Sequence, residues 1–145
     1  MTDDTMAIET RFMQQLRRLR LAGPGQPPFE EVGISPAQLA LLEWVAASPG
    51  CKLAGLAAGL HLTPPTVSVG VRRLEEAGLL ARHPDPEDAR ARQFHLTEAG
   101  EKLWSRVQLY RREKVWGLLS GLSQDEQKML VALLDRALRH AEQSS

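Results

Sequence analysis

The sequence predicts a mainly α-helical fold with one small β-hairpin, in one compact domain of 145 residues. Apolar residues recur at helical spacing in segments that open on Ser, Thr or Asp caps and close on glycine or proline. Only residues 79–83 and 92–96 resemble short strands, with a polar turn between them. The 18 basic and 18 acidic residues balance, which argues against a protein that coats nucleic acid through bulk positive charge.

The N-terminal third of the chain predicts two helices and a connector. The first helix is expected over residues 4–21, and the proline- and glycine-rich residues 22–33 are interpreted as a connector. Ser35 and Pro36 suit an N-cap and a first helical turn. Residues 37–48 are apolar on nearly every side, which is typical of a helix buried among others.

Two short helices joined by a tight turn follow, over residues 53–59 and 64–77. Thr63 suits the N-cap of the second helix, and Gly78 suits its left-handed C-terminal stop. This layout is typical of a helix-turn-helix, whose second helix enters the major groove of DNA; an ordinary helical hairpin is the alternative. The inner faces can pack through Leu53, Leu56, Ala57, Leu60, Val67, Val71 and Leu74.

The β-hairpin favours DNA binding, because a hairpin directly after a helix-turn-helix has the position of a wing. Its tip carries Asp88 and Arg90, and the negative potential of a narrow minor groove attracts an inserted arginine. Asp88 is placed to hold Arg90 by an ion pair. A solvated turn of mixed charge is the alternative, because five arginines and five acids lie between residues 72 and 92.

DNA contacts are therefore expected from the second helix and the hairpin. Small hydrogen-bonding side chains suit base edges, and arginines further along suit phosphates. The candidate DNA-binding residues are Thr63, Pro65, Thr66, Ser68, Val69, Arg72, Arg73, Asp88, Arg90 and Arg92.

Two long helices complete the chain, over residues 97–119 and 123–141. Thr97 suits the cap of the first, and Ser123 with Glu126 forms a capping box for the second. Apolar residues on these helices and on the first helix would lack partners in a monomer. The sequence thus favours a homodimer over a monomer in which these helices fold over the DNA-binding part.

Four motifs in residues 53–100 carry a family resemblance: TVS (66–68), RRLEEAGLL (72–80), DPEDAR (85–90) and LTEAG (96–100). In combination they resemble the MarR family of winged helix-turn-helix transcriptional regulators, and the order of flanking helices agrees over nearly the whole chain. The resemblance implies a homodimer that reads a pseudo-palindromic operator, with repression relieved by a small-molecule effector. A winged-helix module that binds protein, without sequence-specific DNA binding, is the alternative.

The resemblance also implies individual roles. Thr66 and Ser68 would lie near bases or phosphates, and Arg73 on phosphate. Arg90 would lie in the minor groove, oriented by Asp88. Many family members carry an arginine where this chain has Val69, so a base-reading contact worth ~1–3 kcal/mol is absent at that position. Contact between Val69 and a thymine methyl group is a possible substitute.

The resemblance divides the chain into three parts of one intertwined domain. Residues 1–34 and 97–145 would form the dimerisation parts, and residues 35–96 the DNA-binding lobe. A small aromatic or phenolic effector would bind in a cleft between these parts. Its candidate contacts are Phe12, Trp44 and Trp104.

Other function classes receive little support from the sequence. The four histidines are scattered, no phosphate-binding glycine loop or nucleophile motif is present, and we expect no enzyme, metal or cofactor. His83 and His95 are expected to approach each other across the hairpin. The single cysteine, Cys51, is interpreted as a small loop residue, which fits a cytoplasmic location. No apolar stretch is long enough to span a membrane.

Overall fold

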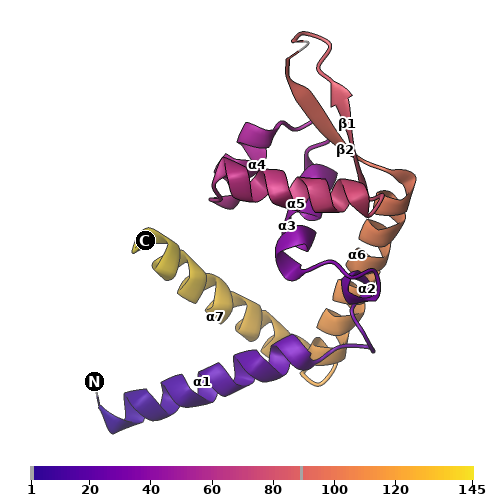
Figure 1. Ribbon diagram of the computed structural model, residues 1–145. Coiled ribbons are helices and arrows are strands. Elements are labelled where there is room, and N and C mark those ends of the chain that lie inside the picture. The colour runs from indigo at the N-terminus through magenta and orange to yellow at the C-terminus, as the bar shows by residue number, and fades with distance from the viewer. Residues whose placement is uncertain (1, 89) are drawn as a thin grey trace. The chain divides into compact units, whose positions relative to one another are not determined.

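A computed structural model describes residues 2–88 and 90–145, and it confirms a mainly helical chain with one β-hairpin (Figure 1). The chain divides into two compact units. Residues 25–110 form the central unit, and residues 1–24 with 111–145 form the terminal unit. Among the described residues, no helix is both long and apolar enough to cross a membrane.

The central unit holds the predicted helix-turn-helix. Its helices are α2 (Pro28–Glu31), α3 (Pro36–Ala47), α4 (Leu53–Leu60), α5 (Pro64–Glu76) and the first part of α6 (Glu98–Leu119). The helix α2 was not expected, because four residues are too few to show a helical period and they lie in a connector rich in proline. The other boundaries match the expected ones within a residue or two.

A single core occupies the central unit. The helix α3 is the most buried element, as its apolar composition predicted, and the capping box of Ser35 and Gln38 fixes its start. Gly70 lets α5 approach α3 closely, since a Cβ atom at that position would lie 2.4 Å from a Leu41 methyl carbon. The buried core residues include Leu39, Leu41, Leu42, Val45, Leu56, Ala57, Val67, Val71, Leu74 and Phe94.

The hairpin is antiparallel, with β1 at Leu80–Pro84 and β2 at Arg92–Leu96. Leu80 pairs with Leu96 at its base, and Pro84 pairs with Arg92 at its outer end. The segment before α4, at Gly50 and Cys51, pairs with β2 through backbone hydrogen bonds. Gly50 donates its N–H to the Phe94 carbonyl at 2.9 Å, and Phe94 donates to the Cys51 carbonyl at 2.9 Å. The hairpin base is therefore fixed to the start of the helix-turn-helix by backbone hydrogen bonds.

The terminal unit consists of α1 (Asp3–Leu21), the end of α6 and α7 (Gln124–Gln143). The predicted capping box of Ser123 and Glu126 is present at the start of α7. Gln127 donates its side-chain N–H to the Leu119 carbonyl at 2.8 Å, which fixes the turn between α6 and α7. Across the described ranges of α1 and α7, no residue is buried.

Candidate nucleic-acid interface

A left-handed residue forms the turn between α4 and α5. His61 has a φ of 55°, and its N–H bonds back to the carbonyls that end α4. Thr63 then caps α5: its hydroxyl oxygen accepts the Thr66 N–H at 3.4 Å and lies 2.8 Å from the Thr66 hydroxyl. The predicted N-cap is thus confirmed, and the first turn of α5 is exposed around it.

The start of α5 has no free backbone donor for an anion, in contrast to most helix N-termini. Pro64 and Pro65 have no N–H. The Thr66 N–H is used by the cap, and the Val67 N–H bonds to the Thr63 carbonyl. Any contact that this helix start makes with DNA must therefore come from side chains.

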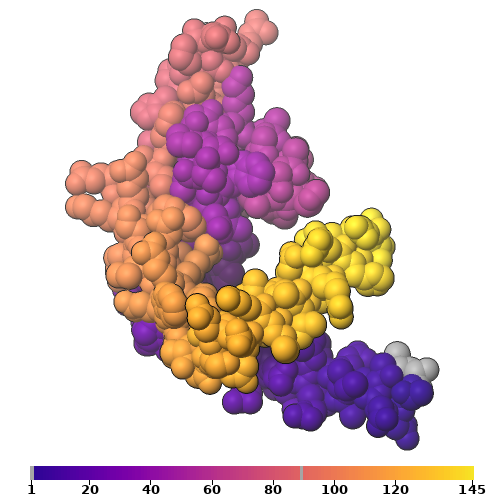
Figure 2. All heavy atoms as spheres, turned by 180° about the vertical axis from the view of Figure 1, so that it is seen from behind, coloured from indigo at the N-terminus to yellow at the C-terminus, as the bar shows by residue number. Residues whose placement is uncertain are grey.

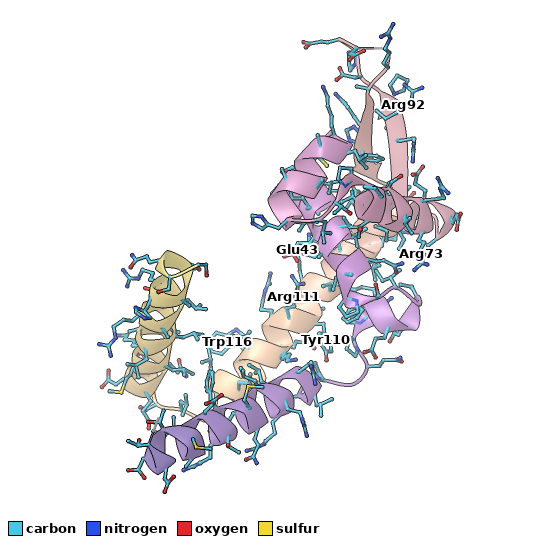
Figure 3. The ribbon with its side chains drawn as sticks, turned by 60° about the vertical axis from the view of Figure 1, so that its left-hand side comes forward. Glu43, Arg73, Arg92, Tyr110, Arg111 and Trp116 are labelled. Atoms are coloured by element: carbon cyan, nitrogen blue, oxygen red, sulfur yellow. The ribbon has the colours of Figure 1, made fainter. Side chains whose placement is uncertain are left out.

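The outer face of α5 presents the candidate residues to solvent, and the inner face supplies the core. Val67, Val71 and Leu74 are buried. On the opposite face, Val69 is 51% exposed. Ser68 is half-buried beside it. The remaining exposed candidates on this helix are Pro65, Thr66, Arg72 and Arg73, the last labelled in Figure 3.

The wing, which we define as β1, the described loop residues 85–88 and 90–91, and β2, stands out from the body of the central unit (Figure 2). Two aspartates organise its loop. The Asp85 Oδ1 atom accepts the Glu87 N–H at 2.8 Å, and the Asp88 Oδ1 atom accepts the Arg90 N–H at 3.0 Å. Asp88 thus acts on the backbone of Arg90. Arg90 and Arg92 are both exposed.

An ion pair that the sequence analysis missed joins the wing to α5. The Arg82 guanidinium donates to both oxygens of the Glu75 carboxylate: Nε lies 2.9 Å from Oε2 and 3.2 Å from Oε1, and Nη2 lies 2.5 Å from Oε1. This hydrogen bonding raises the pKa of Arg82 above its ordinary value. Arg82 also lies over the Phe94 ring, 5.5 Å from its centroid. Glu75 lies on α5 and Arg82 on β1, so the spacing within one helix or strand does not relate them, and the sequence offered no signal for this contact.

The wing and the helix-turn-helix enclose a basic hollow of about 320 Å³. Four cationic side chains line it, from the start of α4, from β1 and from the outer end of the wing. The Ser68 hydroxyl-bearing side chain lines it from α5. The structure thus brings the predicted contact residues Ser68 of α5 and Arg90 and Arg92 of the wing to one hollow. The cations are Lys52, Arg82, Arg90 and Arg92, the last labelled in Figure 3.

Comparison with known proteins identifies the family. The MarR family profile matches residues 32–91. The chain is 32% identical over 113 residues to the uncharacterized HTH-type transcriptional regulator YkoM of Bacillus subtilis strain 168, over 78% of this chain and 73% of that protein. The chain belongs to the MarR family. It is a MarR-type transcriptional regulator and not an enzyme.

Solved structures of MarR-like proteins share the fold. The structure of YusO from Bacillus subtilis matches with a TM-score of 0.76 at 21% identity, over 96% of this chain and 99% of that one. The S. aureus MepR–DNA complex matches with a TM-score of 0.67 at 27% identity, over 94% and 96% of the two chains. The winged helix-turn-helix predicted from the sequence is thus confirmed.

Histidine and cysteine side chains of this MarR regulator were also considered in the sequence predictions. The rings of His83 and His95 meet edge-to-face at 5.2 Å, as expected across the hairpin. Burial raises the pKa of the Cys51 thiol, which opposes formation of a reactive thiolate. Within the described residues, no group of three or more His, Cys, Asp or Glu could hold a metal ion.

Proposed function

We propose that this MarR regulator acts as a homodimer that represses transcription from a pseudo-palindromic operator. The observation that carries the proposal is the surface formed by α5 and the wing. On it, the small exposed side chains at the start of α5 lie with five exposed arginines, three of which line the basic hollow together with Lys52. A dimer on an operator blocks polymerase without any further contact, which makes repression the simplest outcome. Such a regulator works at the chromosome, so we expect it in the cytoplasm.

The proposal of a dimer is supported by the exposed apolar side chains of the terminal unit. Helix α7 leaves its leucines about half exposed, at spacings of three and four residues. A monomer rarely exposes apolar surface of this extent, and a second copy of the chain presents the same surface in a twofold-symmetric contact. The exposed apolar residues of α1 and α7 include Ile8, Phe12, Leu16, Leu19, Met129, Leu130, Leu133, Leu134 and Leu138.

An aromatic or phenolic effector is proposed to bind beside Trp104. Trp104 lines a hollow of about 330 Å³ within the central unit, together with Val45, His95 and Glu101. Trp44 is half-buried and packs against Gly59, and Phe12 lies on α1 with half of its side chain exposed. We expect phenol or salicylate to quench tryptophan fluorescence saturably. Trp104→Phe should abolish the quenching, and Trp116→Phe should retain it.

Selection of DNA from a random pool tests the proposed function. The wild-type protein is incubated with 30-base-pair random duplexes, and the retained sequences are compared for twofold symmetry. We expect a pseudo-palindrome whose affinity falls steeply with salt, because phosphate contacts release counterions. Absence of any enriched sequence, or binding that does not change with salt, would support the protein-binding alternative instead.

A further inference from the structure

An ion pair between Lys52 and Asp85 holds the outer end of the wing. Neither residue lies on α5. The Lys52 Nζ atom lies 2.7 Å from the Asp85 Oδ2 atom. Lys52 immediately precedes α4, and Asp85 immediately follows β1. The pair therefore connects the helix-turn-helix to the first residue of the loop that carries Arg90.

The Asp85 carboxylate is set up for this contact. Its side chain is 6% exposed, and no other charged residue that the structure describes is buried. A buried carboxylate is tolerated only with partners, and both of its oxygens have them: Oδ2 pairs with Lys52 and Oδ1 accepts the Glu87 N–H. The hydrogen bond from Lys52 lowers the pKa of Asp85, so the carboxylate stays ionised at neutral pH.

The pair lies at the loop end of the hairpin, where it can fix the position of the loop. The backbone rung between Cys51 and Phe94 fixes the middle of β2, and the Arg82–Glu75 pair fixes the middle of β1. Asp85 lies beyond the last paired residues of the two strands, Pro84 and Arg92, and its N–H donates to the Ala91 carbonyl at 3.2 Å. The ion pair is the contact that ties this end of the loop to the helix-turn-helix, because the backbone bond joins the loop only to itself.

We propose that Lys52 and Asp85 are positioning residues, which hold the wing loop at the angle that lets Arg90 enter the minor groove. Asp85 acts on DNA through Arg90 and needs no contact with DNA itself. This inference rests on the proposed DNA-binding function, and it adds a positioning role for Asp85 and for Lys52, which also lines the basic hollow.

The direction in which Asp85→Asn changes the DNA affinity distinguishes a positioning role from a purely electrostatic one. Asp85→Asn removes a negative charge close to the basic hollow, and its amide oxygen can still accept the Glu87 N–H. If Asp85 affects DNA only through its charge, the substitution strengthens binding, because it reduces repulsion of the phosphates. If Asp85 positions the wing, the same substitution weakens binding.

The experiment uses the duplex that the wild-type protein selects from the random pool. Dissociation constants are measured at one salt concentration, with hydroxyl-radical footprints of the minor groove and dimethyl sulfate protection of guanines in the major groove. Asp85→Asn and Lys52→Met should each bind about tenfold more weakly, in line with the loss of one good contact. Both should lose the minor-groove protection and keep the major-groove protection.

Two further variants complete the test. Lys52→Arg keeps the positive charge and should retain the wild-type affinity and footprint. Lys102→Gln breaks the exposed pair of Lys102 with Glu98 on the same unit, and it should change neither. If Asp85→Asn fails to fold, as judged by circular dichroism, the footprint of Lys52→Met decides the question, because the Lys52 side chain is 52% exposed and the variant is expected to fold. Selective loss of the minor-groove protection supports positioning, and weaker binding with an unchanged footprint overturns it.

The inference is overturned if Asp85→Asn binds as well as or better than wild type with the minor groove still protected. Loss of both protections in a folded variant also overturns it, since the defect would then lie outside the wing. If the wild-type protein selects no duplex at all, the proposed function fails first and this inference fails with it.

Discussion

The central unit and the terminal unit differ in how far their apolar residues are buried. The central unit buries a continuous core that runs from Ile34 to Val107. Among the described residues of the terminal unit, α1 and α7 bury none, and α7 leaves side chains such as Leu134 about half exposed. The central unit therefore has the core of an independently folded part, whereas the terminal helices need further contacts to cover their apolar faces. Five predictions test this difference.

The largest effect is expected on α7. Leu134→Asp places a charge on the apolar face and should convert the proposed dimer to a monomer, as measured by light scattering. Because two linked recognition helices bind far more tightly than one, affinity for the selected duplex should fall by about 100-fold or more. Lys128→Asp places an aspartate outside the apolar face of α7, with an even larger change of charge, and should leave the dimer intact. A dimeric Leu134→Asp variant would show that α7 is not the interface.

A core truncation in the central unit should act on folding itself. Leu42 is fully buried, so Leu42→Ala should lower the free energy of unfolding by ~2–5 kcal/mol through lost contacts and a cavity. The loss should be the same at all protein concentrations. Leu134→Ala should instead give a loss that depends on protein concentration, because it weakens association. Urea unfolding at two concentrations distinguishes the two behaviours, and identical dependence for both variants would contradict the comparison.

Two glycines on α4 give a matched pair. A Cβ atom at Gly59 would lie 2.1 Å from the Trp44 ring, whereas one at Gly55 would have nothing within 4 Å. Gly59→Ala should destabilise the protein by ~1–3 kcal/mol through overpacking. Gly55→Ala should stabilise it by up to ~1 kcal/mol, because alanine favours a helix. Thermal unfolding measures both, and a stable Gly59→Ala variant would mean that Trp44 moves freely.

A contact residue in the wing should affect DNA binding without affecting assembly. Arg90→Ala is expected to weaken binding of the selected duplex by about tenfold and to leave the dimer unchanged. Gel-shift titration and light scattering measure the two properties separately. Unchanged affinity would show that the wing does not contact DNA through Arg90.

The smallest effect is a pH dependence of stability. The pKa of Asp85 is lowered in the folded protein by the hydrogen bond from Lys52, so the pair stabilises the folded state above the ordinary pKa of aspartate, about 3.9. That contribution is lost as the pH falls through the lowered pKa. The stability gap between wild type and Asp85→Asn should therefore be present at pH 7 and shrink below about pH 4. Urea midpoints across this range test it, and a constant gap would argue against the ion pair.

Local patterns were sufficient for every element except α2 and for the inner and outer faces of α5. Helical periodicity, the caps at Thr63 and Ser123 and the strand pattern at residues 92–96 each depend on neighbouring residues, so a single sequence reveals them. The same periodicity assigned Val67 and Val71 to the inner face of α5 and the candidate contacts to its outer face. The roles of those contacts on DNA stay predictions.

Contacts between residues far apart in the chain were decided only by the tertiary structure. The Lys52–Asp85 pair joins residues separated by a helix-turn-helix and a strand, and no pattern in the sequence selects Asp85 over Glu87 as its partner. The short helix α2 and the close approach of Gly59 to Trp44 were equally hidden. Apart from α2, the sequence by itself determined which segments become helix or strand, because hydrogen bonding and side-chain period act locally. Which side chains meet depends on how those segments pack, and packing is set by the whole core at once.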